Sequence, residues 1–72
     1  MALTIEHFLS PNDRYIVYLI GFNGSRLLGN GFWTLSDAES YGTRALADSA
    51  EWSHFEIVNR YLNEQPIERA KQ

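Results

Sequence analysis

Cysteine is absent from this sequence, proline occurs only twice, and no long uninterrupted apolar run is present. Without cysteine, neither a disulfide nor a thiolate zinc site can hold the chain together, so its stability must come from one hydrophobic core. The lack of cysteine also fits a reducing compartment. Because 44% of the residues are hydrophobic, the chain is expected to fold as a single domain over residues 1–72.

No segment approaches the roughly 20 consecutive apolar residues of a membrane-spanning helix. The first ten residues lack a basic start and carry Glu6 and His7 within their apolar stretch, which is unlike a signal peptide. We therefore expect a cytoplasmic protein with no membrane partner. Six basic residues against nine acidic ones give a net charge of −3, which argues against a grip on phosphate backbones.

The clearest secondary-structure signal is a strand over residues 14–22, which is rich in β-branched and aromatic residues. Both of its faces are apolar, as is typical of a central strand covered above and below. Asn23 and Gly24 follow, and an Asn-Gly pair between two strand-like runs is a strong hairpin signal. The second strand is expected over residues 26–33, where Gly29 and Gly31 indicate a bulge or a twisted edge.

A helix is predicted to begin at Ser36, because Ser36 and Glu39 have the spacing of a capping box. Apolar residues recur at helical spacing through this region. Gly42 lies mid-helix, where it costs about 1 kcal/mol relative to alanine, and close packing against a sheet would explain it. A third strand is expected over residues 52–62, with an alternating pattern that favours an edge position.

The two ends of the chain give weaker signals. Thr4 is placed to cap a short helix ending before Pro11, although a strand through the same residues is the alternative, and we favour the helix. The polar tail, residues 63–72, is expected to fray or to form one helical turn after Pro66.

Together these elements predict an α+β fold of order ββαβ, with a three-stranded antiparallel sheet ordered 2-1-3 and one helix on one face. The opposite face would expose a large apolar patch. We expect either the N-terminal segment or a second molecule to cover it.

The sequence carries no catalytic or metal-binding motif. His7 and His54 lack partners at metal-ligand spacing. Ser53 precedes His54, but neighbouring residues on a strand point to opposite faces, so the two side chains are not expected to meet. We therefore predict no enzymatic activity, no cofactor and no metal ion.

Aromatic residues are the best candidates for a binding surface, because tryptophan, tyrosine and arginine dominate protein interfaces. Phe32 and Trp33 are consecutive, so one should enter the core and the other should face outward. We predict Trp33, Trp52 and Tyr18 as anchors for a partner. Acidic residues on or beside the helix would steer a basic partner surface; they are Asp37, Glu39, Asp48 and Glu51.

The stretch from residue 14 to residue 60 resembles small proteins of phages and mobile elements. These proteins have a hairpin, then a segment like "FWTLSDAE" that opens a helix, then a short strand like "FEIV". Several anti-CRISPR proteins are similar in size, mild acidity and element order. The resemblance is architectural, and it implies a stoichiometric binder of a host protein complex that does no catalysis.

The leading hypothesis is therefore a small protein-binding module, of the kind that inhibits a host defence complex such as CRISPR-Cas. The first alternative is a single-stranded nucleic-acid binder that stacks bases on an aromatic sheet face formed by Tyr18, Trp33 and Arg60. The second alternative is a structural homodimer whose sheets pack face to face.

Overall fold

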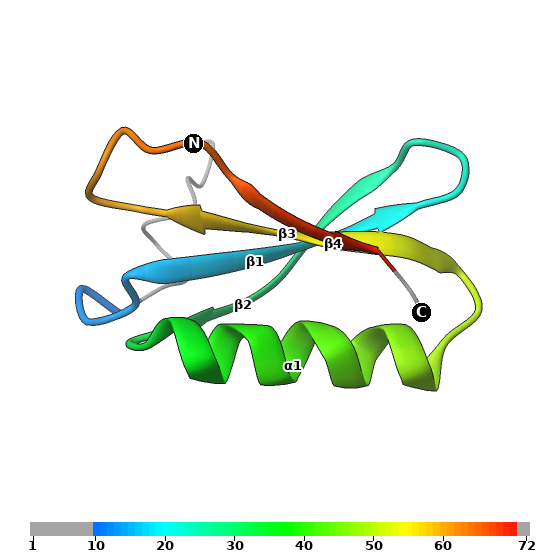
Figure 1. The fold of residues 1–72 in the computed structure, drawn as a ribbon, viewed down its shortest axis with the longest axis horizontal. Helices are drawn as coiled ribbons and strands as arrows, with labels where there is room; N and C mark the ends of the chain where they lie inside the picture. Colours follow the sequence, from blue (N-terminus) through cyan, green and yellow to red (C-terminus); the bar gives the residue numbers. More distant parts are fainter. Residues whose placement is uncertain (1–9, 71–72) are drawn as a thin grey trace, which may run out of the picture.

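The computed structural model describes residues 10–70 of the chain, so the predicted N-terminal helix lies outside the described residues. One helix and four strands follow one another along this stretch (Figure 1). Their bounds are β1 Tyr15–Gly21, β2 Arg26–Phe32, α1 Leu35–Asp48, β3 Trp52–Asn59 and β4 Ile67–Ala70.

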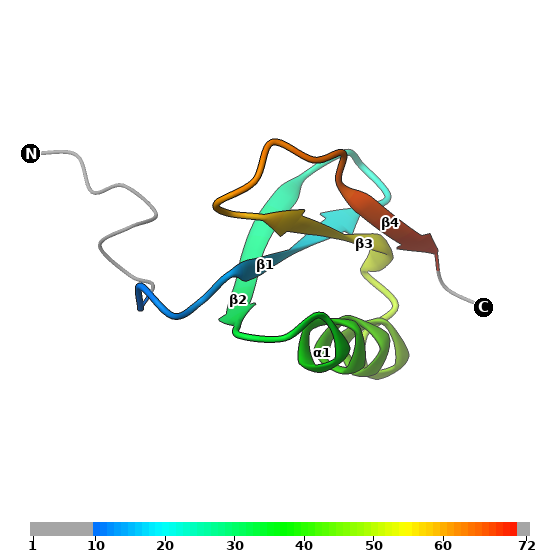
Figure 2. The same cartoon turned by 60° about the vertical axis from the view of Figure 1, so that its left-hand side comes forward.

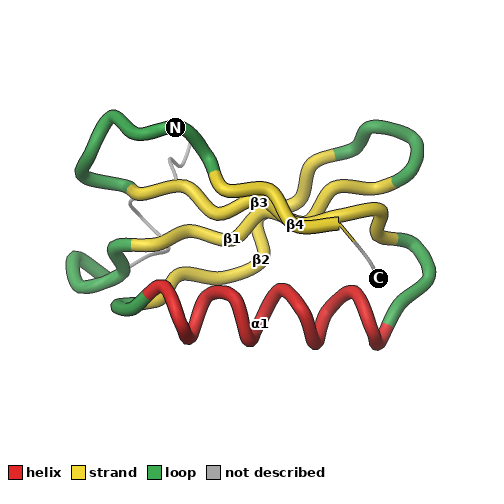
Figure 3. The backbone as a smooth tube through the Cα atoms, viewed as in Figure 1, coloured by secondary structure: helices red, strands yellow, loops and turns green. Residues whose placement is uncertain are grey.

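The four strands form one sheet in the order β2-β1-β3-β4, and every neighbouring pair is antiparallel. Figure 3 shows this sheet lying above α1. The predicted α+β class, the antiparallel pairing and the central position of β1 are confirmed. The predicted number of strands is wrong, because a fourth strand lies beyond β3.

β4 forms in the tail that was expected to fray or to form one helical turn, so both expectations are wrong for residues 67–70. Ile67 lies opposite Ile57 of β3 and packs against the hydrophobic core. This burial and the pairing with β3 stabilise a segment that has only four residues. As a consequence β3 is an inner strand, and the predicted edge position is wrong.

The β1–β2 hairpin turns where the Asn-Gly signal places it. Gly24 has a φ of 88°, a left-handed conformation that glycine adopts without strain. The Asn23 side chain accepts a hydrogen bond from the Ser25 N–H at 3.0 Å. The pairing of β1 with β2 shifts register between Val17 and Tyr18, because Val17 pairs with Asn30 and Tyr18 pairs with Leu28. Gly29 is therefore an extra residue in β2, which is the bulge that the glycines of this strand predict.

The helix begins earlier than predicted. Its N-cap is Thr34, whose side-chain oxygen accepts a hydrogen bond from the Asp37 N–H at 3.2 Å. Ser36 is the second residue of α1 and is exposed. The chain uses Thr34 because Leu35 then packs against the core, which fixes the start of α1 one residue before Ser36.

The core lies between α1 and one face of the sheet (Figure 2). Its buried residues come from the two central strands and the helix, and they are Val17, Leu19, Ala38, Leu46, Phe55 and Ile57. Gly42 is buried as well, and a Cβ built there would lie 2.6 Å from the Cε2 atom of Phe55. Close approach of helix to sheet is therefore the reason for this mid-helix glycine.

The opposite face of the sheet is mixed in character, because half-buried apolar residues lie there beside polar ones; the apolar residues are Ile20, Leu28 and Val58. Ile16 is 2% exposed, although it points away from the helix. Near Ile16 the turn at residues 10–13 is tied to the end of β3, because the Arg60 guanidinium donates to the Ser10 carbonyl at 2.6 Å and the Tyr61 hydroxyl donates to the Pro11 carbonyl. Of the residues predicted to form an exposed apolar patch, Ile16 is buried and Tyr18 and Ile20 are half-buried. Most of the N-terminal segment that was expected to cover this face lies outside the described residues.

Candidate functional site

Phe32 and Trp33 point in opposite directions, as predicted. Phe32 packs against the core, with its ring centroid 5.3 Å from that of Tyr41. Trp33 is 57% exposed and is one of the large hydrophobic side chains that face solvent. Phe32 therefore closes the corner between sheet and helix, and Trp33 is presented outward immediately before the helix cap.

The Trp33 indole has a partner that the sequence did not reveal. The guanidinium carbon of Arg14 lies over the indole ring, 4.9 Å from its centroid. The two residues meet because Tyr15 of β1 pairs with Phe32 of β2. Arg14 precedes Tyr15 and Trp33 follows Phe32, so both lie just beyond this pair at the same end of the sheet. Arg14 alternates with the core residue Tyr15 and therefore lies on the face opposite the helix. The sequence predicts this contact only if the pairing register of the β1–β2 hairpin is counted outward from the Asn-Gly turn.

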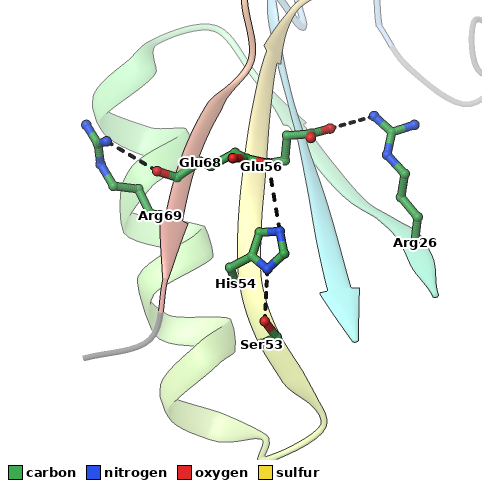
Figure 4. A network of polar contacts seen from close by, with 6 residues as sticks. All are labelled: Arg26, Ser53, His54, Glu56, Glu68 and Arg69. Carbon is green, nitrogen blue, oxygen red and sulfur yellow. Dashed lines mark hydrogen bonds and ion pairs between the residues drawn. The ribbon is translucent and has the colours of Figure 1, made fainter. Parts of the chain in front are cut away.

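A second arginine–aromatic pair lies further along the same face. Arg26 of β2 stacks over the ring of Tyr18, with its guanidinium carbon 3.8 Å from the centroid. The same guanidinium donates to Glu56 of β3 at 2.7 Å, as Figure 4 shows. The Glu56 side chain is 17% exposed and that of Arg26 is 51% exposed. Tyr18 is therefore half-buried under an ion pair that spans three strands, instead of standing free as a predicted anchor.

Ser53 and His54 do meet, so the prediction that they point apart is wrong. The Ser53 hydroxyl and His54 Nδ1 lie 2.9 Å apart (Figure 4). The cause is a shift in register: His54 pairs with Ile20 and Trp52 pairs with Gly21, so Ser53 is an extra residue in β3. A bulge of this kind breaks the alternation of side chains along a strand.

The other ring nitrogen of His54 faces a carboxylate. His54 Nε2 lies 4.0 Å from Glu68 of β4, which is too long for a hydrogen bond. Ser53, His54 and Glu68 thus lie close together. The 4.0 Å distance between His54 Nε2 and Glu68 is too long for the carboxylate to orient the imidazole as a general base requires. Within residues 10–70, no group of three or more histidine, cysteine or acidic residues is arranged to hold a metal ion.

The structure separates the predicted anchors and acidic residues instead of gathering them. Trp52 is half-buried and packs against the core at the far end of α1. Asp37 lies in the first turn of α1 and Asp48 is its last residue, which places them about 16 Å apart along the axis at 1.5 Å per residue. Glu39 pairs with Arg69 of β4 at 3.4 Å.

A groove lies between α1 and β4, where the sequence predicted no feature. It has a volume of about 540 Å³. The groove exists because the backbone of α1 lies close to β1, β2 and β3 but not to β4, which the helix reaches through the Glu39–Arg69 ion pair. Its lining is Glu39, Thr43, Leu46, Ala47, Phe55, Arg69 and Ala70.

No family model, curated protein or solved structure matches this chain. Over residues 10–70, α1 is too short and too polar to cross a membrane.

Proposed function

We propose that the chain is a small non-enzymatic protein-binding module, and that it binds its partner through the sheet face opposite α1. The observation that carries the proposal is the position of Trp33. Its indole is 57% exposed, yet it directly follows a residue that is packed in the core. Exposed tryptophans in fixed positions are the side chains that most often contribute strongly to binding.

The surroundings of Trp33 hold it in place before any partner arrives. Phe32 is anchored by Tyr41 on one side of Trp33, and Thr34 caps the helix on the other. The Arg14 guanidinium lies over the indole, and the Arg14 carbonyl accepts a hydrogen bond from the Arg60 N–H at 2.8 Å. A side chain that is already ordered loses less conformational entropy on binding, so more of its contact energy appears as affinity.

The charges on this face favour a protein over a nucleic acid. Arg14, Arg26 and Arg60 share this face with Glu56 and Glu68. Because two carboxylates offset two of the three guanidiniums, and Arg60 already donates to the Ser10 and Asp13 carbonyls, the face has little of the excess positive charge that holds a phosphate backbone. Single-stranded nucleic acid remains the second candidate, since Arg14 and Arg26 lie over aromatic rings that bases also favour.

A narrower proposal concerns the identity of the partner. We propose a host defence complex of the CRISPR-Cas type, encountered in the cytoplasm, and the support for it is the architectural resemblance alone. Asp37, Asp48 and Glu51 are exposed on or beside α1, outside the proposed sheet face, so they would attract a lysine-rich partner only at longer range, whereas Glu39 is engaged by Arg69. A CRISPR interference assay, in which this protein is expressed beside a targeted plasmid, tests this proposal. Unchanged plasmid loss in every system tried contradicts it.

The general proposal is tested by affinity capture from the cells that produce the protein, comparing the wild type with Trp33→Ala. Phe22→Ala is the matched control, because Phe22 is 74% exposed in the β1–β2 turn, away from Trp33. We expect a captured protein that disappears with Trp33→Ala and persists with Phe22→Ala. Equal capture by both variants contradicts the proposed surface.

The alternative of a structural homodimer is tested by sedimentation at micromolar protein concentration. A protein that sediments only as a monomer excludes the homodimer.

A further inference from the structure

We infer that the Trp33–Arg14 pair recognises a carboxylate that lies beside an apolar pocket on the partner. Arg14 binds the carboxylate, and the indole of Trp33 enters the pocket. This inference rests on the proposed function and names the chemistry that the partner must present.

Arg14 is the arginine that combines a neighbouring aromatic ring with donors to spare among residues 10–70, because Arg44 on α1 is also unpaired but has no ring beside it. Arg26 donates to Glu56 at 2.7 Å, Arg69 donates to Glu39 at 3.4 Å, and Arg60 donates to the Ser10 carbonyl at 2.6 Å. Arg14 is exposed, and no carboxylate among residues 10–70 lies within ion-pair distance of its guanidinium. The nearest acidic residue in sequence, Asp13, uses its carboxylate to accept the Ser10 N–H at 3.0 Å.

The contact with Trp33 leaves donors of Arg14 available. A guanidinium carries five N–H groups, and among residues 10–70 no acceptor engages those of Arg14, which lies over the indole. Two of these N–H groups fit the two oxygens of a carboxylate, and such bidentate pairs are stronger than neutral hydrogen bonds. The adjacent indole removes water from one side of the pair, which strengthens the attraction further.

The backbone on either side of Arg14 is fixed. The Arg14 carbonyl accepts the Arg60 N–H at 2.8 Å, and the Asp13 N–H donates to the Ser10 carbonyl at 2.9 Å. Arg60 also donates to the Asp13 carbonyl at 3.3 Å. The strand on which Trp33 follows Phe32 is held by the pairing of Phe32 with Tyr15. Both side chains of the pair are therefore carried on ordered backbone.

A carboxylate of a protein fits this surface better than a phosphate of a nucleic acid. A single carboxylate needs one guanidinium, whereas a nucleic acid brings successive phosphates along the face. Those further phosphates would approach Glu68, whose side chain is 66% exposed, and Glu56. The repulsion of these two residues selects a ligand with one localised negative charge.

A phage-displayed library of random 12-residue peptides tests the inference without knowledge of the natural partner. The library is selected on the wild-type protein, and the affinities of the enriched peptides are then measured for Trp33→Ala, Arg14→Gln and Arg14→Lys. Arg44→Gln is the matched control, because Arg44 is exposed on α1 and the substitution removes the same charge from the other side of the molecule. A 15-nucleotide oligo(dT) is titrated in parallel at low salt.

We expect enriched peptides that place an aspartate, a glutamate or a free C-terminal carboxylate beside apolar residues. Their affinity should fall about tenfold or more with Arg14→Gln and with Trp33→Ala, less with Arg14→Lys, and not with Arg44→Gln. Amidating the C-terminus of a selected peptide separates a terminal carboxylate from a side-chain one.

Three results overturn the inference, and they separate it from the proposed function. If the peptides depend on Trp33 but not on Arg14, the binding surface stands and the carboxylate recognition fails. If no peptide depends on Trp33, both fail. If oligo(dT) binds through Arg14 more tightly than any peptide, the ligand is a phosphate and the protein-binding proposal fails with the inference.

Discussion

The backbone of α1 at Gly42 lies directly against the ring of Phe55. A Cβ atom at residue 42 would come within 2.6 Å of the ring atom Cε2, a separation that real Cβ atoms do not show. Phe55 is 2% exposed and fills the centre of the core, so its ring has little room to move aside. This contact sets how closely the helix approaches the sheet.

Substituting Gly42 with alanine should destabilise the protein, although alanine is the better helix former. The gain in helix propensity is about 1 kcal/mol, whereas overfilling a packed core costs about 1–3 kcal/mol and displaces α1. Urea denaturation followed by circular dichroism measures the change. Ser40→Ala, at an exposed position of the same helix, is the control and should be neutral or slightly stabilising. An increase in stability for Gly42→Ala contradicts the close contact.

The N-cap assignment predicts different effects for two neighbouring hydroxyl residues. Thr34→Ala removes the acceptor of the Asp37 N–H and should lower the free energy of unfolding by about 1 kcal/mol. Ser36→Ala affects an exposed residue inside the helix and should change it by less than about 0.5 kcal/mol. The two variants are compared by thermal and urea denaturation under identical conditions. A larger loss for Ser36→Ala would place the cap at Ser36 instead.

The ion pair between Arg26 and Glu56 should contribute more than the pair between Arg69 and Glu39. It is shorter, at 2.7 Å against 3.4 Å, and its carboxylate is 17% exposed against 38%. Double-mutant cycles with glutamine substitutions should give a coupling of about 0.5–1 kcal/mol for the first pair and about half of that or less for the second. Repeating the cycles at 1 M salt should reduce both couplings. Equal couplings would mean that solvent screens both pairs alike.

Ile67 tests whether β4 is an integral part of the sheet. Full burial of isoleucine makes its replacement by alanine cost about 2–5 kcal/mol, and for the half-buried Ile67 we expect about 1–2 kcal/mol. Leu62→Ala is the control, because Leu62 is 59% exposed in the preceding loop and should change stability by less than about 0.5 kcal/mol. An unaltered stability for Ile67→Ala would show that the sheet folds without β4.

Local signals in the sequence predict the centre of this fold. The apolar residues on both sides of β1 indicate a covered central strand, and β1 has neighbours on each side. Asn23 and Gly24 indicate the hairpin, and Gly24 adopts the left-handed conformation that such a turn requires. The adjacency of Phe32 and Trp33 predicts that they face opposite ways, because alternation is a property of the backbone alone.

Features that depend on tertiary packing escape the same reasoning. Thr34 and Ser36 both resemble helix caps, and only the burial of Leu35 decides between them. β4 lacks a local signal of its own, since its four residues are stabilised by pairing with β3. Ser53 meets His54 only because a bulge arises where β3 pairs with β1.

The candidate site was predicted in part. Alternation predicts that one of Phe32 and Trp33 faces outward but not which one, and the contact of Trp33 with Arg14 requires the register of the hairpin. Tyr18 was expected to be an open anchor, and it is covered because Arg26 of one neighbouring strand reaches across it to Glu56 of the other. Such cross-strand contacts become visible only once the order and register of the strands are known.

The central place of β1 in the sheet also determines how the molecule exchanges its amide hydrogens with solvent. Because β1 has a hydrogen-bonded strand on each side, its amide hydrogens can exchange with solvent only when the sheet separates. They should therefore be among the slowest to be replaced by deuterium. β2 and β4 border the sheet and can open without disturbing the rest. Tyr18 and the proposed binding face should therefore stay in place until the whole sheet opens, while β2 and β4 exchange their amide hydrogens sooner.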